Sequence, residues 1–211
     1  MANGKVEVKK RIAVFIDRDG TITEEVGYVN HADRLKLIHN AAKAICLLNK
    51  AGILAICASN QAGVARGYFP LSLVYKVNEK LNKLLKRQGA YLDAIYFCPH
   101  HKDGAVPDFK VDCDCRKPKI GMIKKAADEF NIDIRSSYAV GDKYTDVEFA
   151  RNAGCMAIMV KTGYGKGELE IFGNDWKDRP DCVAEDLFDA VRWILRREGL
   201  EAEKIETCKN S

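Results

Sequence analysis

Two aspartates lie one residue apart in the string VFIDRDGTIT, directly after an apolar run. Residues i and i+2 of extended backbone point to the same side, so Asp17 and Asp19 can face one pocket, with Gly20 letting the chain turn sharply away. The two like charges repel each other, and a hard divalent cation such as Mg²⁺ relieves that repulsion while leaving room for a substrate phosphate. The simpler alternative is that DRDG is only a turn signal.

Polar residues also mark the ends of later apolar runs. Ser59 and Asn60 end the second run, and Asp142 with Lys143 end the fourth. If these runs are strands of one parallel sheet, their carboxyl ends meet at the edge where ligands bind in such sheets. Asp142 then supplies a third carboxylate, and its presence favours a functional site over a turn signal.

Carboxylates, Mg²⁺ and lysine together suit phosphoryl transfer. One aspartate can attack phosphorus to form an aspartyl-phosphate, while the other protonates the leaving oxygen and later activates water. Lys117, Lys143 and the Ser59 hydroxyl would stabilise the phosphoryl oxygens. The chain lacks the GxxxxGK[ST] loop, which argues against nucleotide hydrolysis of that kind.

A second constellation joins three cysteines and a histidine in the strings CPHH and CDC. Cys98, either His100 or His101, Cys113 and Cys115 make a Cys₃His set that suits a closed, structural Zn²⁺ site. The alternative is a chance cluster, but the loop around it has few apolar residues to order it without metal. Such a zinc site would also aim the two cations that follow Cys115 at the phosphate pocket.

The elements that position these residues alternate along the chain. Apolar, β-branched runs predict strands at 11–16, 53–58, 94–97, 137–140 and 156–160. Helical spacing predicts helices at 40–52, 71–88, 121–130, 146–154 and 184–197, with a last strand in the C-terminal part. Near-continuously apolar strands separated by helices predict an α/β fold with a doubly wound parallel sheet covered on both faces.

Bulk properties exclude several classes of protein. The 211 residues carry a net charge of +4 with no long basic run, which argues against nucleic acid as a partner. No stretch approaches the roughly 18 apolar residues that span a bilayer, and the N-terminus does not resemble a signal peptide. The cysteines suit a reducing compartment. We therefore expect a cytoplasmic protein without membrane partners.

Four ordered strings, DRDGT, SNQAG, CRKPK and VGDKYTD, resemble the motifs of the haloacid dehalogenase superfamily. Together with CPHH and CDC they are similar to its zinc-containing branch of small-sugar and histidinol phosphatases. The resemblance runs from about Arg11 to Gly165. It implies a Rossmann-like doubly wound sheet with a zinc-stapled loop and no large cap domain.

The resemblance implies a role for each residue that matches a family motif. Asp17 would be the nucleophile and Asp19 the general acid/base, with Mg²⁺ held by Asp17, the Asp19 backbone carbonyl and Asp142. Ser59 stands where relatives usually have threonine and would donate to the phosphate, and Lys117 would hold the phosphoryl group. The implied substrate-binding residues are Glu25, Val26, Gly27, Tyr28, Asn60, Gln61, Ala62, Arg116 and Lys143.

For the zinc site the resemblance selects His100, beside Cys98, Cys113 and Cys115. Arg116 would recognise the distal part of a sugar phosphate. The strings GYV at 27–29, NQAGVARG and YFCPHH are similar to phosphatases that remove the C7 phosphate of D-glycero-D-manno-heptose 1,7-bisphosphate, in making activated heptose for surface polysaccharide. Histidinol phosphate or another small sugar phosphate is the alternative substrate, and a non-catalytic zinc-loop binding module is the rival of another class.

The expected organisation is an N-terminal extension (1–10), one phosphatase domain (11–198) that contains the zinc loop (98–118), and a frayed C-terminal tail (199–211). The expected partner is a small phosphorylated sugar bound by a monomer.

Overall fold

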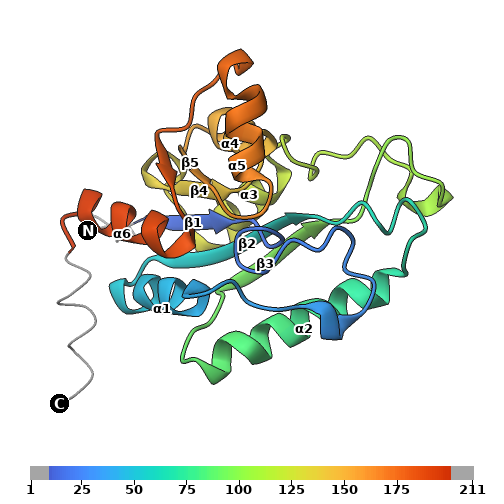
Figure 1. Cartoon of the computed structure of the whole chain (residues 1–211), viewed down its shortest axis with the longest axis horizontal. Coiled ribbons are helices and arrows are strands. Elements are labelled where there is room, and N and C mark those ends of the chain that lie inside the picture. Colours follow the sequence, from blue (N-terminus) through green and yellow to red (C-terminus); the bar gives the residue numbers. More distant parts are fainter. Residues whose placement is uncertain (1–9, 201–211) are drawn as a thin grey trace, which may run out of the picture.

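Six short apolar strands form one parallel sheet in the order β3-β2-β1-β4-β5-β6 in the computed structural model, which describes residues 10–200 (Figure 1). The strands are β1 (Ala13–Ile16), β2 (Leu54–Asn60), β3 (Ala94–Cys98), β4 (Tyr138–Gly141), β5 (Met156–Val160) and β6 (Cys182–Ala184). β1 lies between β2 and β4, with Val14 in register with Ala55 on one side and Tyr138 on the other.

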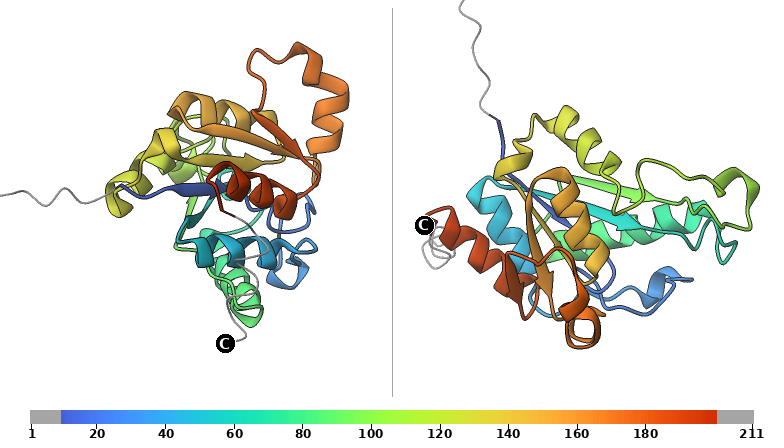
Figure 2. Two further views of the ribbon diagram at one scale, coloured as in Figure 1. Left: turned by 90° about the vertical axis from the view of Figure 1, so that its left-hand side faces the viewer. Right: turned by 90° about the horizontal axis from the view of Figure 1, so that it is seen from above.

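Helices follow the strands and cover both faces of the sheet (Figures 1 and 2). The α-helices are α1 (Ala41–Ala51), α2 (Leu71–Arg87), α3 (Gly121–Phe130), α4 (Tyr144–Ala153), α5 (Gly165–Gly167) and α6 (Leu187–Arg197). Short 3₁₀ turns lie at Ala32–Arg34, Pro107–Phe109, Ile134–Ser136 and Gly173–Asp175, and one π-helical turn at Glu168–Phe172.

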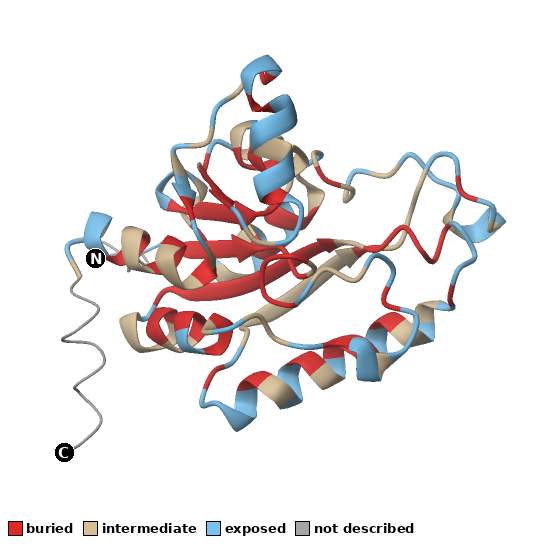
Figure 3. Ribbon diagram, viewed as in Figure 1, coloured by how far each residue is buried: buried red, intermediate tan, exposed pale blue. Residues whose placement is uncertain are grey.

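Alternate residues of the central strands enter two separate cores. Val14 and Ile16 of β1 pack in the cluster that includes α1, α2 and α6, while Ala13 and Phe15 pack in the cluster that includes α3 and α4. Both faces of the central strands are buried (Figure 3). Burial on both faces explains why the strands read as continuous apolar runs and not as alternating patterns.

The α/β class with a doubly wound parallel sheet, inferred from the sequence, is confirmed, and no large cap interrupts residues 10–200. Boundaries differ in places: β2 continues through Asn60, so Ser59 and Asn60 are its last residues. α4 begins at Tyr144, two residues before the expected start. The helical turns over 165–175 were not expected, because glycines and acidic residues there hide any helical period.

No helix in the described part of the chain is long and apolar enough to cross a membrane. The predicted N-terminal extension lies almost wholly outside the described residues, and so does the predicted tail beyond residue 200. The loop 98–118 contains one 3₁₀ turn and no strand after Cys98, in line with its weak sequence signal.

Candidate active site

The carboxyl ends of β1, β2 and β4 open into a pocket of about 360 Å³. Its wall contains most of the residues that the sequence predicts for a site. The lining residues are Asp17, Asp19, Glu25, Gly27, Tyr28, Val29, Ser59, Asn60, Gln61, Ala62, Arg116, Lys117, Lys143, Thr145, Asp146 and Tyr164.

Two predicted residues lie elsewhere. Val26 is absent from the pocket wall because its side chain packs against the core cluster on the α1 side of the sheet. Asp142 is fully buried beneath the pocket, where it approaches Asp17 and Asp146. The pocket therefore has an open upper part and a buried carboxylate floor.

Lys117 joins two carboxylates at this floor. Its Nζ lies 2.6 Å from Asp17 Oδ1 and 2.6 Å from Asp146 Oδ1. Burial alone would lower the pKa of Lys117, but the carboxylates of Asp146 and Asp17 outweigh it and raise the pKa above its ordinary value. The lysine is therefore a fixed cation at the point where Asp17 enters the pocket.

The sequence did not predict Asp146, nor Val29, Thr145 and Tyr164 of the pocket wall, and Asp146 matters most among them. It lies in the quoted string VGDKYTD, so a signal for it was present, but only Asp142 and Lys143 were singled out there. In the structure Asp146 occupies the first turn of α4, and its Oδ2 accepts from the Lys143 backbone N–H at 3.2 Å. The same carboxylate thus caps the N-terminus of α4 and pairs with Lys117.

Three carboxylates meet at the floor of the pocket. One oxygen each of Asp17, Asp142 and Asp146 lies within 4.8 Å of the others. Burial, opposed by Lys117, raises the pKa of Asp17 to about 6, and burial together with Asp17 raises the pKa of Asp142 to about 8. Asp142 Oδ1 is buried without a hydrogen-bond partner. A crowded oxygen-only donor set with one orphaned oxygen fits a Mg²⁺ ion.

Two glycines make room for Asp142. A Cβ on Gly20, whose φ is +86°, or on Gly163, whose φ is +57°, would lie 2.1 Å from Asp142 Oδ2. The same oxygen accepts from the backbone N–H of Tyr164 at 2.9 Å. Both the positive φ and the close approach require glycine here, so the Asp142 carboxylate is held by backbone from two distant loops.

β2 positions Lys117 as well as the Ser59 hydroxyl. The Asn60 side chain donates to the Lys117 carbonyl at 3.1 Å and accepts from the Lys117 N–H at 3.0 Å. Gln61 Nε2 lies 2.9 Å from Ser59 Oγ and 2.8 Å from Asp19 Oδ2. The predicted substrate-binding residues Asn60 and Gln61 therefore also orient their neighbours.

The rim of the pocket is cationic. Arg116 lies on the wall formed by the 98–118 loop, where Nη1 donates to the His100 carbonyl at 3.4 Å. Lys143 Nζ lies 3.6 Å from Glu25 Oε2 and 4.3 Å from the centroid of the Tyr164 ring. Two cations on separate elements can therefore meet an anionic substrate above the carboxylate floor.

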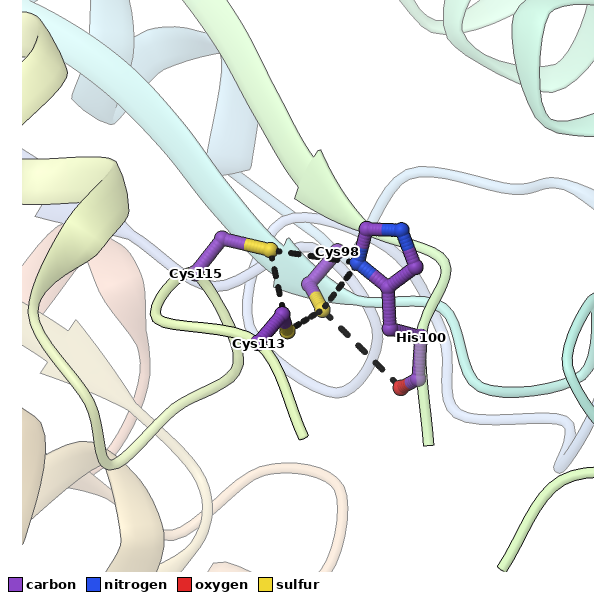
Figure 4. A group of neighbouring side chains, drawn as sticks. All are labelled: Cys98, His100, Cys113 and Cys115. Atoms are coloured by element: carbon purple, nitrogen blue, oxygen red, sulfur yellow. Dashed lines mark hydrogen bonds between the residues drawn. The ribbon is translucent and has the colours of Figure 1, made fainter. Parts of the chain in front are cut away.

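The three cysteines and His100 come together beside this rim (Figure 4). Cys113 Sγ lies 3.4 Å from Cys98 Sγ and 3.2 Å from Cys115 Sγ, and His100 Nδ1 lies 3.8 Å from Cys98 Sγ and 3.5 Å from Cys115 Sγ. His101 Nδ1 instead accepts from the Asp103 N–H at 3.1 Å.

These four side chains fit a zinc ion. Ligands roughly 2.0–2.3 Å from a tetrahedral zinc lie roughly 3.3–3.8 Å from one another, close to the observed separations. Hydrogen bonding with Cys98 lowers the pKa of Cys115 to about 5 and raises the pKa of Cys98. The cluster therefore favours a thiolate, the form in which cysteine binds metals.

Comparison with known proteins begins with a family model. Residues 114–190 match the model of the HAD-hydrolase-like family. A longer match joins the chain to D-glycero-D-manno-heptose-1,7-bisphosphate 7-phosphatase of Thermosynechococcus vestitus. The two are 44% identical over 188 residues, which cover 87% of this chain and 95% of that protein.

Two further relatives agree with this match. The D-glycero-beta-D-manno-heptose-1,7-bisphosphate 7-phosphatase of Haemophilus influenzae is 41% identical over 189 residues, covering 88% of this chain and 97% of that protein. The crystal structure of D,D-heptose 1.7-bisphosphate phosphatase from B. bronchiseptica, complexed with magnesium and phosphate, matches with a TM-score of 0.78 at 30% identity. It covers 88% of this chain and 99% of that one.

Proposed function

Because the chain belongs to the family of D-glycero-D-manno-heptose-1,7-bisphosphate 7-phosphatases, we propose that it hydrolyses the C7 phosphate of D-glycero-D-manno-heptose 1,7-bisphosphate. The reaction would serve the supply of activated heptose for surface polysaccharide. The observation that carries the proposal is one pocket that joins a carboxylate floor, a buried lysine and a cationic rim.

In this proposal Asp17 is the nucleophile. Its carboxylate oxygen attacks the phosphorus of the C7 phosphate, the bond from phosphorus to the C7 oxygen breaks, and Asp19 gives a proton to that oxygen. Water then attacks the aspartyl-phosphate and passes a proton to Asp19, which frees Asp17 and inorganic phosphate. Asp17 suits the role because it lies at the junction of the pocket and its buried floor.

Asp17, Asp142 and the Asp19 backbone carbonyl would hold Mg²⁺, with Asp146 close by. When bound, the ion would neutralise the carboxylates and the charge on the phosphoryl oxygens. Lys117 and the Ser59 hydroxyl would donate to the same oxygens. Lys117 supports this assignment because its ammonium group already faces Asp17 at 2.6 Å.

The rest of the substrate would occupy the upper part of the pocket. Arg116 and Lys143 would meet its second phosphate and hydroxyl groups, with Glu25, Gly27 and Tyr28 forming one wall and Ala62 another part of the lining. Arginine suits a terminal phosphate because its planar guanidinium can donate two parallel hydrogen bonds. We place Zn²⁺ in the Cys98, His100, Cys113 and Cys115 cluster as a structural ion that orders the loop carrying Arg116.

The proposed setting is a cytoplasmic monomer with no nucleic-acid or membrane partner. The pocket of about 360 Å³ with its cationic rim supports a small phosphorylated sugar as the partner.

A substrate panel tests the proposal. Phosphate release is measured with Mg²⁺ for the heptose 1,7-bisphosphate, histidinol phosphate and 4-nitrophenyl phosphate. We expect kcat/KM for the heptose bisphosphate to be the highest by at least about 10-fold, because only this substrate engages Arg116 through a second phosphate. Equal values for histidinol phosphate would contradict the specificity, and no release from any ester would contradict phosphatase activity.

Arg116→Ala makes the panel sharper. The variant should lower kcat/KM for the bisphosphate by about 10- to 100-fold, as expected for losing hydrogen bonds to a charged group, and should change it little for 4-nitrophenyl phosphate. The matched control is Arg87→Ala at the exposed end of α2, which should change neither value.

A further inference from the structure

A fully buried arginine lies between the two catalytic aspartates in the sequence, and the proposed reaction gives it no role. The Arg18 side chain is 1% exposed, whereas that of Asp19 is 15% exposed and reaches the pocket wall. Burying a guanidinium group is costly unless it is paired and hydrogen-bonded. Its partners therefore show what holds it in place.

Arg18 binds the Asp19 carboxylate through two parallel hydrogen bonds. Nε donates to Asp19 Oδ1 at 3.0 Å and Nη2 donates to Asp19 Oδ2 at 2.7 Å. Such a fork fixes the plane of the carboxylate as well as its distance. Gln61 adds a further hydrogen bond to Oδ2 at 2.8 Å.

The remaining arm of the guanidinium group reaches α2. Nη1 donates to Asn78 Oδ1 at 3.2 Å. Asn78 is buried on the inner face of α2, on which Val74, Val77, Leu81 and Leu85 are the other buried residues. A polar residue in an otherwise apolar stripe needs a partner, and Arg18 is that partner. A helix outside the pocket thus holds the arginine that holds Asp19.

We propose that Arg18 and Asn78 are positioning residues that hold Asp19 as an oriented carboxylate for the second half of the proposed reaction. In that half, water attacks the phosphorus of the aspartyl-phosphate on Asp17. The bond from phosphorus to the Asp17 oxygen breaks, the water proton passes to Asp19, and inorganic phosphate leaves.

The orientation of Asp19 matters to this half-reaction whichever ester is used, because Asp19 accepts the proton of water there. The first half needs Asp19 as an acid, and an ester with a good leaving group does not need that acid at all. The two halves can therefore be separated by the choice of ester.

The inference rests on the proposed phosphatase activity, and 4-nitrophenyl phosphate tests it. For this ester kcat/KM reports transfer of the phosphoryl group to Asp17, whereas kcat also includes hydrolysis of the aspartyl-phosphate. We expect Arg18→Met to lower kcat by about 10²-fold, within the usual contribution of a general base. The fall in kcat should exceed the fall in kcat/KM at least tenfold, with a pre-steady-state burst of nitrophenolate.

Asn78→Leu keeps the branching and the number of side-chain heavy atoms and removes the amide group that accepts from Arg18, so it tests the network even if Arg18→Met does not fold. It should lower kcat by about 5- to 10-fold with kcat/KM unchanged, while Asn78→Asp, which keeps an oxygen acceptor, should stay within about 3-fold of the unmodified protein. Asn82→Leu, at an exposed position of α2, is the matched control and should change neither constant.

Equal falls in kcat and kcat/KM without a burst would overturn the inference, because a network that merely supports the fold would affect both halves alike. That result would leave the phosphatase proposal standing, since the unmodified protein would still hydrolyse the ester. No hydrolysis by the unmodified protein with Mg²⁺ would instead overturn the proposed function.

Discussion

The two clusters that suit metal ions are built in opposite ways. Asp17 and Asp142 follow neighbouring strands of a buried sheet, and Asp146 lies in the first turn of the next helix, so regular elements hold all three carboxylates. Cys98 ends a strand, but His100, Cys113 and Cys115 lie in an irregular loop with little apolar burial.

This difference separates two uses of a metal. The sheet can hold the carboxylates buried and close together, and their burial and mutual repulsion raise the pKa values of Asp17 and Asp142. The loop has no core of comparable size, so we expect its order to depend on a metal ion bound by its four ligands. We therefore expect the first metal to change chemistry with little effect on the fold, and the second to change the fold of one loop and chemistry only through it.

The largest effect should come from the sheet-held cluster. Asp17→Asn removes the nucleophile and should lower kcat by at least about 10³-fold, a modest figure beside known losses of a nucleophile. Circular dichroism and zinc content should stay as in the unmodified protein. Asp33→Asn, an exposed aspartate near the pocket loop, is the control. Activity near the unmodified level would refute the nucleophile assignment.

A smaller loss is expected when the cation is removed and the carboxylates are kept. Lys117→Ala should lower kcat by about 10²- to 10³-fold, as for the loss of one charge-stabilising donor. Lys119→Ala, whose partner is the exposed Asp112, should change the rate by less than about twofold. An unchanged rate in Lys117→Ala would place this lysine outside the reacting centre.

The loop cluster should give a weaker effect on rate and a stronger effect on local order. Cys113→Ser should abolish zinc binding, speed proteolysis within 98–118 and lower kcat/KM by about 10- to 100-fold. Cys182→Ser, outside both clusters, is the control. If the variant keeps full activity while it has lost zinc, the loop does not depend on its metal and the contrast between the clusters fails.

The smallest effect concerns pH. Asp17 and Asp142 have raised pKa values in the folded chain, so the metal-free fold binds more protons than the unfolded chain, and their contribution to stability is lost as pH rises through about 6 and 8. Mg²⁺ prefers the ionised groups. It should therefore raise Tm more at pH 8.5 than at pH 5, by on the order of a few degrees.

Asp142→Asn should weaken that Mg²⁺ effect, because it removes one of the two titrating ligands. An equal rise of Tm at both pH values in the unmodified protein would show that Mg²⁺ acts away from this floor.

The architecture could be predicted from sequence because its signal is local. Each strand is a short apolar run, and each long helix between strands has apolar residues at helical spacing. The strands and helices on both sides of β1 were therefore predicted. The turns at 165–175 could not be predicted from local spacing, because they make tertiary contacts such as the hydrogen bond from the Tyr144 N–H to Glu168 Oε2 at 3.1 Å. The division of the chain into extension, domain and tail stays a prediction.

Site residues could be predicted where the residue type and its position after an apolar run were signal enough. Asp17, Asp19 and Asp142 stand out by their position after apolar runs, and the structure brings Asp17 and Asp142 together. Pairings across the fold gave no such signal. Nothing in the sequence joins Asn78 to Arg18, or Asn60 to Lys117, since these contacts exist only once helix, strand and loop have packed. The roles of all site residues remain predictions.

The double hydrogen bond between Asn60 and the Lys117 main chain has a consequence for design. It fixes the lysine to the central sheet, 57 residues away along the chain, independently of the loop that precedes it. We therefore expect that the stretch 102–112, which contains none of the four cluster side chains, can be changed without displacing Lys117. Libraries confined to 102–112 should alter which esters are accepted, through the loop that carries Arg116, while Lys117 and the carboxylates stay in place.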